Sequence, residues 1–331
     1  MPTVMIMTKK FAEVARDPIT ALEQAGFTVV EKDYDRVQPS QEDEVCRAIQ
    51  GADAIIVTAM FPATRKVIES SSRLKMIAIR SAGFEGSDLK AATDRGVLVT
   101  CNPGANAESV ADMAIGLMLC VSKQIARRDR GMRQGLYPRG SGSEDLFRKT
   151  VGIIGLGNIG KRVAKRLQGF EARVIANDIV EYPEFQKQYN IPYYSKEDLL
   201  RMADFVTIHV PLDESTRGMI DEERLRLMKK TAFLINTARG PIVDEKALYK
   251  ALKEGWIAGA GLDVFETEPP VFRDHILLEN VVSTPHSAGL SNQASYAMAM
   301  ETVRKVIAFF QGKVPENVLN PEVLKKLELS G

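Results

Sequence analysis

The sequence predicts an α/β protein of two Rossmann-like or flavodoxin-like domains, with mainly parallel, doubly wound sheets and a cleft between them. Short runs rich in valine and isoleucine alternate with amphipathic stretches along most of the 331 residues, which is typical of βαβ units. The alternation forms two series, separated by a different pattern over residues 106–149. A glycine-rich loop, GLGNIG, opens the second series at residues 155–160. Two α/β domains follow from these observations.

The first series predicts five strands joined by helices. Helices are expected at residues 19–25, 41–49, 63–70 and 87–96. The last of these is expected to begin at Ser87 and to end at Gly96, which are typical capping residues. Strands are expected at residues 4–7, 27–30, 54–57, 76–79 and 97–100.

Residues 106–134 interrupt the alternation with one long predicted helix. Its first half is apolar and its second half is basic, and Asn106 is a candidate N-cap. Residues 137–149 are a loop by composition. The second series then predicts strands at residues 151–155, 173–178, 205–210, 232–236, 257–264 and 281–284.

Composition limits the classes of function. Lys plus Arg number 44 against 43 Asp plus Glu, a net charge of +1, so we expect neither a nucleic-acid nor a membrane partner. The MPTVMIMTKKF start is read as a first strand and not as a signal peptide. The three cysteines form no CxxC pair, so we predict no disulfide framework, no metal site and a cytoplasmic location.

The GLGNIG loop matches GxGxxG with Gly155, Gly157 and Gly160. An apolar strand precedes it, a helical stretch follows it, and Asp178 comes after the next strand. In a dinucleotide site the first glycine makes the turn, the second admits the pyrophosphate and the third packs helix on strand, while the acid binds the ribose. A purely structural turn is the alternative, but the context favours a dinucleotide. No arginine directly follows Asp178, which favours NAD over NADP.

Four polar residues lie near or after the ends of predicted strands of the second series: Arg239, Asp263, Glu268 and His286. Ligands of doubly wound sheets bind at the carboxyl ends of strands, so these residues are candidates for a common site. For reduction of a 2-oxo acid, Arg239 would hold the carboxylate and ketone, and His286 would exchange the proton. Glu268 would raise the pKa of His286, and Asp263 would anchor the nicotinamide carboxamide.

Structural roles are the alternative for such residues. A strand-end arginine is often a surface ion-pair partner, and a lone histidine after a strand is often structural. His209, within FVTIHV, is predicted to be structural, and His275, within VFRDHI, is predicted to be a solvated loop residue.

Taken together, several stretches resemble the D-isomer-specific 2-hydroxyacid dehydrogenases. Residues 80–112 are similar to that family's substrate loop and hinge region, and the resemblance extends from about residue 75 to residue 321. The stretches are GLGNIG, HVPLDESTRGMI, INTARGPIVDEKAL, AGLDVFETEPP and STPHSAG.

The resemblance implies a substrate-binding domain of residues 1–100, completed by residues 290–331, and an NAD-binding domain of residues 101–289. It also implies a homodimer joined through the NAD domain and its long helix. The catalytic set would be Arg239, Glu268 and His286. Backbone amides near Ser81, Ala82 and Gly83 would bind the substrate together with Arg239 and His286. The implied NAD contacts are Gly155, Gly157, Asn158, Ile159, Gly160, Asp178, Pro211, Thr216, Thr237, Ala238, Arg239, Asp263, His286, Ala288 and Gly289.

Within the family, the run of sequence is most similar to D-3-phosphoglycerate dehydrogenases, including the ENVLNPEVL segment. Those enzymes often carry an arginine where this chain has Thr58, Ala59 and Met60, so a glyoxylate or hydroxypyruvate reductase, or another D-2-hydroxyacid dehydrogenase, is the alternative. A non-catalytic NAD-sensing scaffold is an alternative of another class. A formate dehydrogenase is disfavoured, because glutamine usually replaces Glu268 there.

Overall fold

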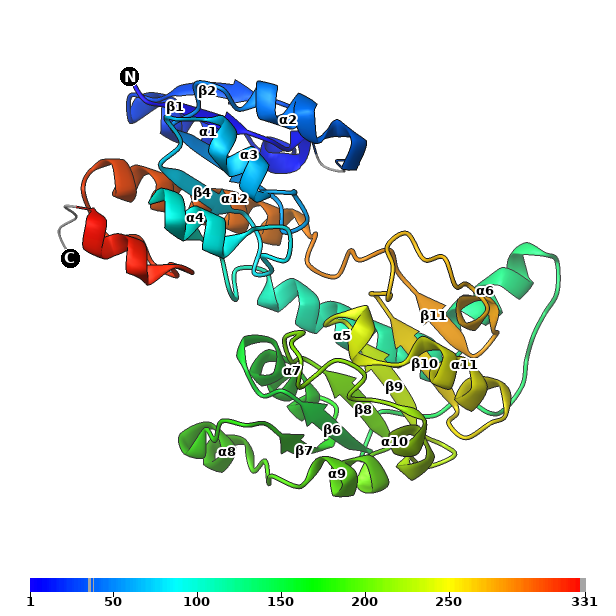
Figure 1. The fold of residues 1–331 in the computed structure, drawn as a ribbon. Helices are drawn as coiled ribbons and strands as arrows, with labels where there is room; N and C mark the ends of the chain where they lie inside the picture. Colours follow the sequence, from blue (N-terminus) through cyan, green and yellow to red (C-terminus); the bar gives the residue numbers. More distant parts are fainter. Residues whose placement is uncertain (35–36, 38, 328–331) are drawn as a thin grey trace. The chain divides into compact units, whose positions relative to one another are not determined.

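The computed structural model describes the chain except for residues 35–36, 38 and 328–331 and the side chains of residues 9, 10, 39 and 326. The chain divides into two compact units, Met1–Asn106 with Leu290–Gly331, and Ala107–Gly289 (Figure 1). Residues 101–106 belong to the first unit and not, as expected, to the second. Hydrogen bonds tie the start of this segment to the first unit, since the Asn102 N–H donates to the Ser81 carbonyl over 2.9 Å.

The first unit contains a five-stranded sheet in the order β2-β1-β3-β4-β5, which is the flavodoxin-like order. Its strands pair in parallel, as the sequence predicts for βαβ units. The strands are β1 (Thr3–Ile6), β2 (Thr28–Glu31), β3 (Ala54–Val57), β4 (Met76–Ile79) and β5 (Leu98–Thr100).

Helices cover both faces of this sheet. On one face, α1 (Asp17–Gln24) and α12 (Asn292–Phe310) pack their apolar residues on β1, β3 and β4. On the other lie α2 (Glu42–Ala48), α3 (Arg65–Ser70) and α4 (Leu89–Arg95). Short 3-10 helices are η1 (Lys9–Ala12), η2 (Pro39–Gln41) and η5 (Pro321–Lys326).

The α4 helix shows how a local sequence sets its ends. Gly96 ends it in the left-handed conformation, with φ +69°, as the sequence predicts. The start differs from the prediction, because Asp88 and not Ser87 is the N-cap. The Asp88 side chain accepts from the Ala91 N–H over 2.8 Å, and a carboxylate also suits the positive end of the helix.

The second unit contains a six-stranded parallel sheet in the order β11-β10-β9-β8-β6-β7. The strand order reverses at β6 and β8, and such a switch point is where doubly wound sheets bind ligands. The strands are β6 (Thr150–Ile154), β7 (Arg173–Asn177), β8 (Phe205–Ile208), β9 (Phe233–Asn236), β10 (Gly259–Leu262) and β11 (Val281–Ser283).

Two apolar cores cover the faces of the second sheet. One lies under α5 (Ala107–Ser122) and α7 (Asn158–Gln168), and the other under α9, α10 and α11. The remaining bounds are α8 (Pro183–Tyr189), α9 (Lys196–Met202), α10 (Glu222–Leu227), α11 (Glu245–Lys253), η3 (Gly240–Ile242) and η4 (His275–Leu277).

The single long helix expected over residues 106–134 is two helices. The α5 helix ends at Ser122, and α6 (Ile125–Arg133) continues at an angle of 62°. Gln124, at φ +57°, lies in the left-handed region and breaks the helix. Among the described residues no single helix is long and apolar enough to cross a membrane; α5 and α6 satisfy that criterion only when taken together as a bent pair.

Candidate active site

Three adjacent strands of the second sheet carry the expected catalytic residues. Arg239 follows β9, Glu268 lies in the loop after β10, and His286 follows β11. These strands are neighbours and run parallel, so their carboxyl ends lie at one edge of the sheet. The topology therefore brings together residues that are up to 47 positions apart in the chain, between 239 and 286.

His286 and Glu268 form a close pair. The His286 Nδ1 and the Glu268 Oε2 are 2.6 Å apart, and the two side chains are 44% and 36% exposed. The other Glu268 oxygen accepts from the Phe265 N–H over 3.2 Å, which fixes the carboxylate. Because Nδ1 faces the carboxylate, Nε2 is the ring nitrogen left to meet a substrate.

The pair shifts the acidity of both partners. The hydrogen bond that His286 donates to Glu268 raises the pKa of His286, while burial and the Arg239 charge act to lower it. Burial acts to raise the pKa of Glu268, but the hydrogen bond and charge of His286 bring it below its ordinary value. The pairing therefore favours an imidazolium beside a carboxylate.

Asp263 holds the loop that carries His286. Its carboxylate is fully buried and accepts from the Thr284 hydroxyl over 2.5 Å and from the Ser287 and Ala288 N–H groups over 2.9 Å each. Its carbonyl accepts from the His286 N–H over 2.7 Å. Asp263 therefore positions the histidine loop. Its carboxylate still has capacity for one further donor, which leaves room for the expected contact with the nicotinamide carboxamide.

The turn after β9 is stabilised by hydrogen bonds within it and by close packing against a neighbouring loop. The Asn236 side chain accepts from the Ala238 N–H over 3.0 Å and donates to the Arg239 carbonyl over 2.9 Å. A Cβ on Gly240 would lie 1.9 Å from the Phe265 carbonyl carbon. Only glycine therefore allows the Arg239 turn to pack against the loop that carries Glu268.

The GLGNIG loop joins β6 to α7 at the switch point. A Cβ on Gly155 would lie 2.6 Å from the His209 carbonyl oxygen, and one on Gly160 would lie 2.1 Å from the Gly155 carbonyl oxygen. A Cβ on Gly157 would meet no described atom within 4 Å, and Gly157 begins α7 without a side-chain cap. The protein's own packing thus requires two of the glycines, and the third leaves space at open helix N–H groups, which fits a dinucleotide pyrophosphate.

Two further observations fit a dinucleotide. Asp178, at the end of β7, accepts from the Leu156 N–H over 2.6 Å and from the Val180 N–H over 3.0 Å, and carboxylate oxygens have capacity for further donors. The Thr237 hydroxyl is buried and has no hydrogen-bond partner among the described residues. Such orphaned polar atoms call for a partner, and a bound cofactor would provide one.

The remaining expected cofactor contacts lie in the same unit. Asn158 and Ile159 form the first turn of α7, and the Thr216 hydroxyl donates to the Pro211 carbonyl over 2.7 Å to close the turn after β8. Ala238 and Ala288 are buried, and Gly289 is the last residue of the unit.

Ser81, Ala82 and Gly83 belong to the first unit, where they follow the end of β4. Within the described part of the chain, the backbone N–H groups of these three residues donate to no protein acceptor. The Ser81 hydroxyl lies 3.4 Å from the Gly83 carbonyl. Consecutive unoccupied N–H groups at the carboxyl end of a parallel strand are suited to a carboxylate.

The predictions for the two other histidines, His209 and His275, differ in how they compare with the structure. His209 is structural, as expected: its Nε2 lies 2.9 Å from the Thr207 hydroxyl, and burial lowers its pKa to about 3. The prediction for His275 is wrong, because the residue is fully buried and its ring stacks on Phe272 at 5.2 Å between centroids. Polar neighbours in the sequence did not reveal that η4 packs inward.

Sequence reasoning missed the residues that support the site. Thr284 and Asn236 hold the histidine and arginine loops, and the Ser109 hydroxyl donates to the Ala288 carbonyl over 2.6 Å. Glu245 accepts from the Glu266 N–H over 2.7 Å and so braces the Glu268 loop. The contacts of Asn236 are local, but those of Thr284, Ser109 and Glu245 join distant segments, which no local pattern contains.

Comparison with known proteins shows the family of the chain. Residues 115–288 match the model of the D-isomer specific 2-hydroxyacid dehydrogenase, NAD binding domain. The chain is 40% identical over 314 residues to the glyoxylate reductase of Korarchaeum cryptofilum and 39% identical over 315 residues to that of Pyrococcus horikoshii, covering 91% of this chain and 94% of each relative.

A solved structure gives the same result. The D-isomer specific 2-hydroxyacid dehydrogenase of Lactobacillus delbrueckii ssp. bulgaricus, in its NAD complexed form, superposes with a TM-score of 0.81 at 27% identity, over 96% of this chain and 100% of that chain. The cofactor is therefore NAD and the reaction class is oxidoreduction. The chain belongs to the D-isomer-specific 2-hydroxyacid dehydrogenase family.

Proposed function

We propose that this protein reduces a small, unphosphorylated 2-oxo acid to the D-2-hydroxy acid, with glyoxylate as the first candidate substrate. The His286–Glu268 pair of 2.6 Å, beside Arg239, carries the proposal. The names of the two curated relatives support this choice over the phosphoglycerate expectation. Thr58, Ala59 and Met60, which follow β3, are also uncharged and offer no cationic partner to a phosphate.

Each catalytic residue has one task in this proposal. The Arg239 guanidinium binds the substrate carboxylate and polarises the ketone oxygen. Bound NADH supplies the hydride. The Nε2 of protonated His286 gives its proton to the ketone oxygen as the carbonyl is reduced, and Glu268 stabilises the imidazolium beforehand. The N–H groups of Ser81, Ala82 and Gly83 take part in holding the carboxylate. In the oxidation direction neutral His286 accepts the proton.

We further propose that the protein is a homodimer joined through its second unit. Large apolar side chains are exposed on α6 and along the segment that follows it, and exposed apolar surface of this kind favours a partner. They are Ile125, Met132, Leu136, Tyr137 and Phe147, with exposed fractions of 48% to 72%.

The free thiols of Cys46, Cys101 and Cys120 support a reducing compartment, and we propose the cytoplasm.

Loss of NADH absorbance with a panel of 2-oxo acids tests the substrate. We expect kcat/KM to be highest with glyoxylate or hydroxypyruvate, and at least tenfold lower with phosphohydroxypyruvate, since a buried phosphate without a cationic partner costs more than about 1.4 kcal/mol. The His286→Ala variant gives the background, and its kcat should fall by about 10² to 10⁴ with NADH binding kept. A preference for phosphohydroxypyruvate would restore the phosphoglycerate assignment. No turnover of any acid would favour the NAD-sensing scaffold.

A further inference from the structure

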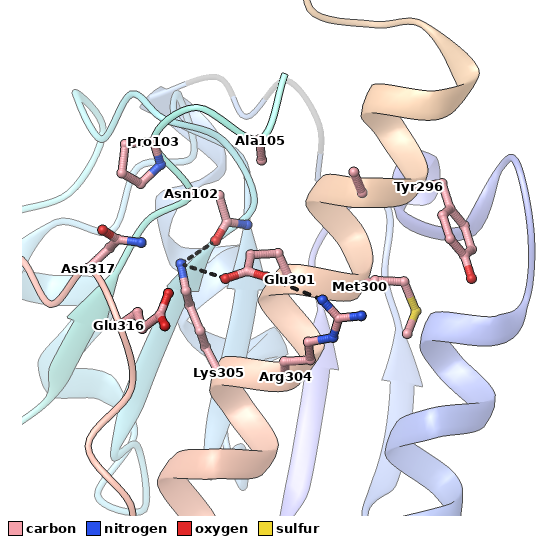
Figure 2. A pocket seen from close by; sticks show the side chains of 11 residues that line it. Asn102, Pro103, Ala105, Tyr296, Met300, Glu301, Arg304, Lys305, Glu316 and Asn317 are labelled. Carbon is pink, nitrogen blue, oxygen red and sulfur yellow. Dashed lines mark hydrogen bonds and ion pairs between the residues drawn. The ribbon is translucent and has the colours of Figure 1, made fainter. Parts of the chain in front are cut away.

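Lys305 is a lysine buried inside the first unit. Its Nζ donates to the Cys101 carbonyl and to the Asn102 Oδ1, both over 2.7 Å, and lies 3.6 Å from a Glu301 oxygen (Figure 2). Its side chain is 4% exposed, whereas the neighbouring Arg304 is 71% exposed. Burial lowers the pKa of Lys305, against the raising effect of Glu301. Burying a cation costs free energy, so the position of Lys305 calls for a structural explanation.

Asn102 connects this lysine to the end of β4. The Asn102 side chain is buried, and its Nδ2 donates to the Arg80 carbonyl over 3.1 Å, to the Met298 carbonyl over 3.1 Å and to the Thr302 hydroxyl over 2.7 Å. The Asn102 N–H donates to the Ser81 carbonyl over 2.9 Å. Asn102 thus links the carbonyls of Arg80 and Ser81, the two residues before Ala82, to the α12 helix.

The ammonium of Lys305 determines how the Asn102 amide is oriented. A lysine ammonium has only donors, so the atom that faces it must be the Asn102 oxygen. The Asn102 NH₂ group is then directed toward the Arg80 carbonyl and α12. With a neutral apolar side chain at position 305, the buried amide oxygen would lose its partner and this preference would disappear.

We propose that Lys305 is a positioning residue for substrate binding, which acts through Asn102 on the loop of Ser81, Ala82 and Gly83. The inference rests on the proposed function, because the N–H groups of that loop are there assigned to the substrate carboxylate. The chain leaves the first unit after Asn106 and returns at Leu290, so Asn102 lies four residues before the first of these connections and Lys305 lies on the helix that follows the second. Lys305 itself touches neither substrate nor cofactor.

A cavity of about 460 Å³ borders this cluster, lined by α12, the segment after β5 and residues 316–317. Figure 2 shows Lys305 turned from α12 toward Asn102, while Arg304 extends away from it. Both cations of the wall, Arg304 and Lys305, are paired with Glu301, which lies 3.6 Å from each, and Glu316 adds a second carboxylate to the lining. The cavity leaves room for the side chains of the cluster to change orientation. We assign no ligand to it.

The test compares Lys305→Met with Arg304→Met in steady-state reduction of glyoxylate by NADH. Both variants remove one cation from the same helix and keep an unbranched stem, but only Lys305 contacts Asn102. For Lys305→Met we expect KM for glyoxylate to rise about tenfold with kcat within about twofold, because the loss is of binding that is equal in ground and transition states. NADH affinity should stay unchanged, and Arg304→Met should match the wild type.

A second variant covers the case in which Lys305→Met does not fold. Asn102→Asp keeps an acceptor for Lys305 and removes the donors to the Arg80 carbonyl, so it should give the same rise in KM. Thermal unfolding of each variant separates a folding defect from a binding defect. An unchanged KM in the folded variants, or a fall in kcat alone, overturns the inference. Turnover of glyoxylate by the wild type tests the proposed function separately. The KM of each variant is compared with that of the wild type, using the 2-oxo acid that the wild type prefers.

Discussion

His286 has a backbone conformation that few residues other than glycine adopt, with φ +52°. Its N–H is held by the Asp263 carbonyl, and its ring is held by Glu268. Residues in the left-handed region often occur at functional sites, where surrounding contacts offset the strain. Here the contacts that hold the backbone also direct Nδ1 toward the carboxylate, so the imidazole is oriented before a substrate binds.

The pH dependence of reduction follows from this pair. In the proposed mechanism, reduction needs protonated His286. The pKa of His286 is raised above its ordinary 6.5, so activity should persist above pH 6.5 and fall as pH rises through the raised pKa. Glu268→Gln removes the carboxylate charge, and the falling limb should move to lower pH by roughly one unit or more. Profiles of kcat against pH for both proteins measure this shift.

Glu279→Gln provides the matched control for that shift. Glu279 is 69% exposed and pairs with Arg127, so its removal also takes away one carboxylate but leaves the histidine pair intact. Its profile should overlay that of the wild type. If Glu268→Gln also overlays the wild type, the carboxylate does not set the acidity of His286.

At the scale of elements, two glycines in the turn between β6 and α7 have different roles. Gly160 is required because a side chain would collide with the backbone of the same turn, while Gly157 faces space that no described protein atom fills. Both positions look alike in the GxGxxG pattern. Their packing assigns Gly160 to the fold and leaves space at Gly157 for the proposed pyrophosphate contact.

The two glycines should respond differently to alanine. Gly157→Ala should keep the melting temperature of the wild type and weaken NADH binding about tenfold or more, a loss of about 1.4 kcal/mol. Gly160→Ala should lower the free energy of unfolding by at least about 1–3 kcal/mol, because its Cβ would lie 2.1 Å from the Gly155 carbonyl oxygen. Fluorescence titration with NADH and thermal unfolding give the two readouts. Tight NADH binding by Gly157→Ala would contradict the assignment of that space to the pyrophosphate.

At the scale of the whole molecule, the proposed dimer depends on the surface of α6 and the segment that follows it. Leu136 is 59% exposed and Tyr137 is 72% exposed, so their side chains have little contact with their own unit. A stable interface buries about 800 Å² on each partner. Large apolar side chains gathered at one place are typical of the core of such an interface.

A charge placed in this surface should separate the subunits. We expect the wild type to sediment as a dimer and Tyr137→Arg to sediment as a monomer, because an unpaired buried charge opposes association. Val271→Arg is the control, since Val271 is 83% exposed in the loop after β10, outside the α6 surface. Analytical ultracentrifugation compares the three proteins. A monomeric wild type, or a dimeric Tyr137→Arg variant, would contradict the proposed interface.

The sequence by itself determined the α/β class, the order of the strands along the chain and the family. Each of the eleven predicted strands coincides with a strand of the structure to within a few residues at its ends, because buried parallel strands are short apolar runs that local composition reveals. Motif spacing also identified Arg239, Glu268 and His286 as candidates, since each directly follows such a run or lies in the loop after it.

Only the tertiary structure decided what those residues contact. The break at Gln124, the burial of His275 and the engagement of both Asp263 oxygens by the histidine loop depend on segments far apart in the chain. The same is true of Lys305, which looks like an ordinary helical lysine in the sequence, yet it lies buried against Cys101 and Asn102. Local patterns record which residues prefer burial, whereas the partner of each buried polar group is set by strand order and helix packing.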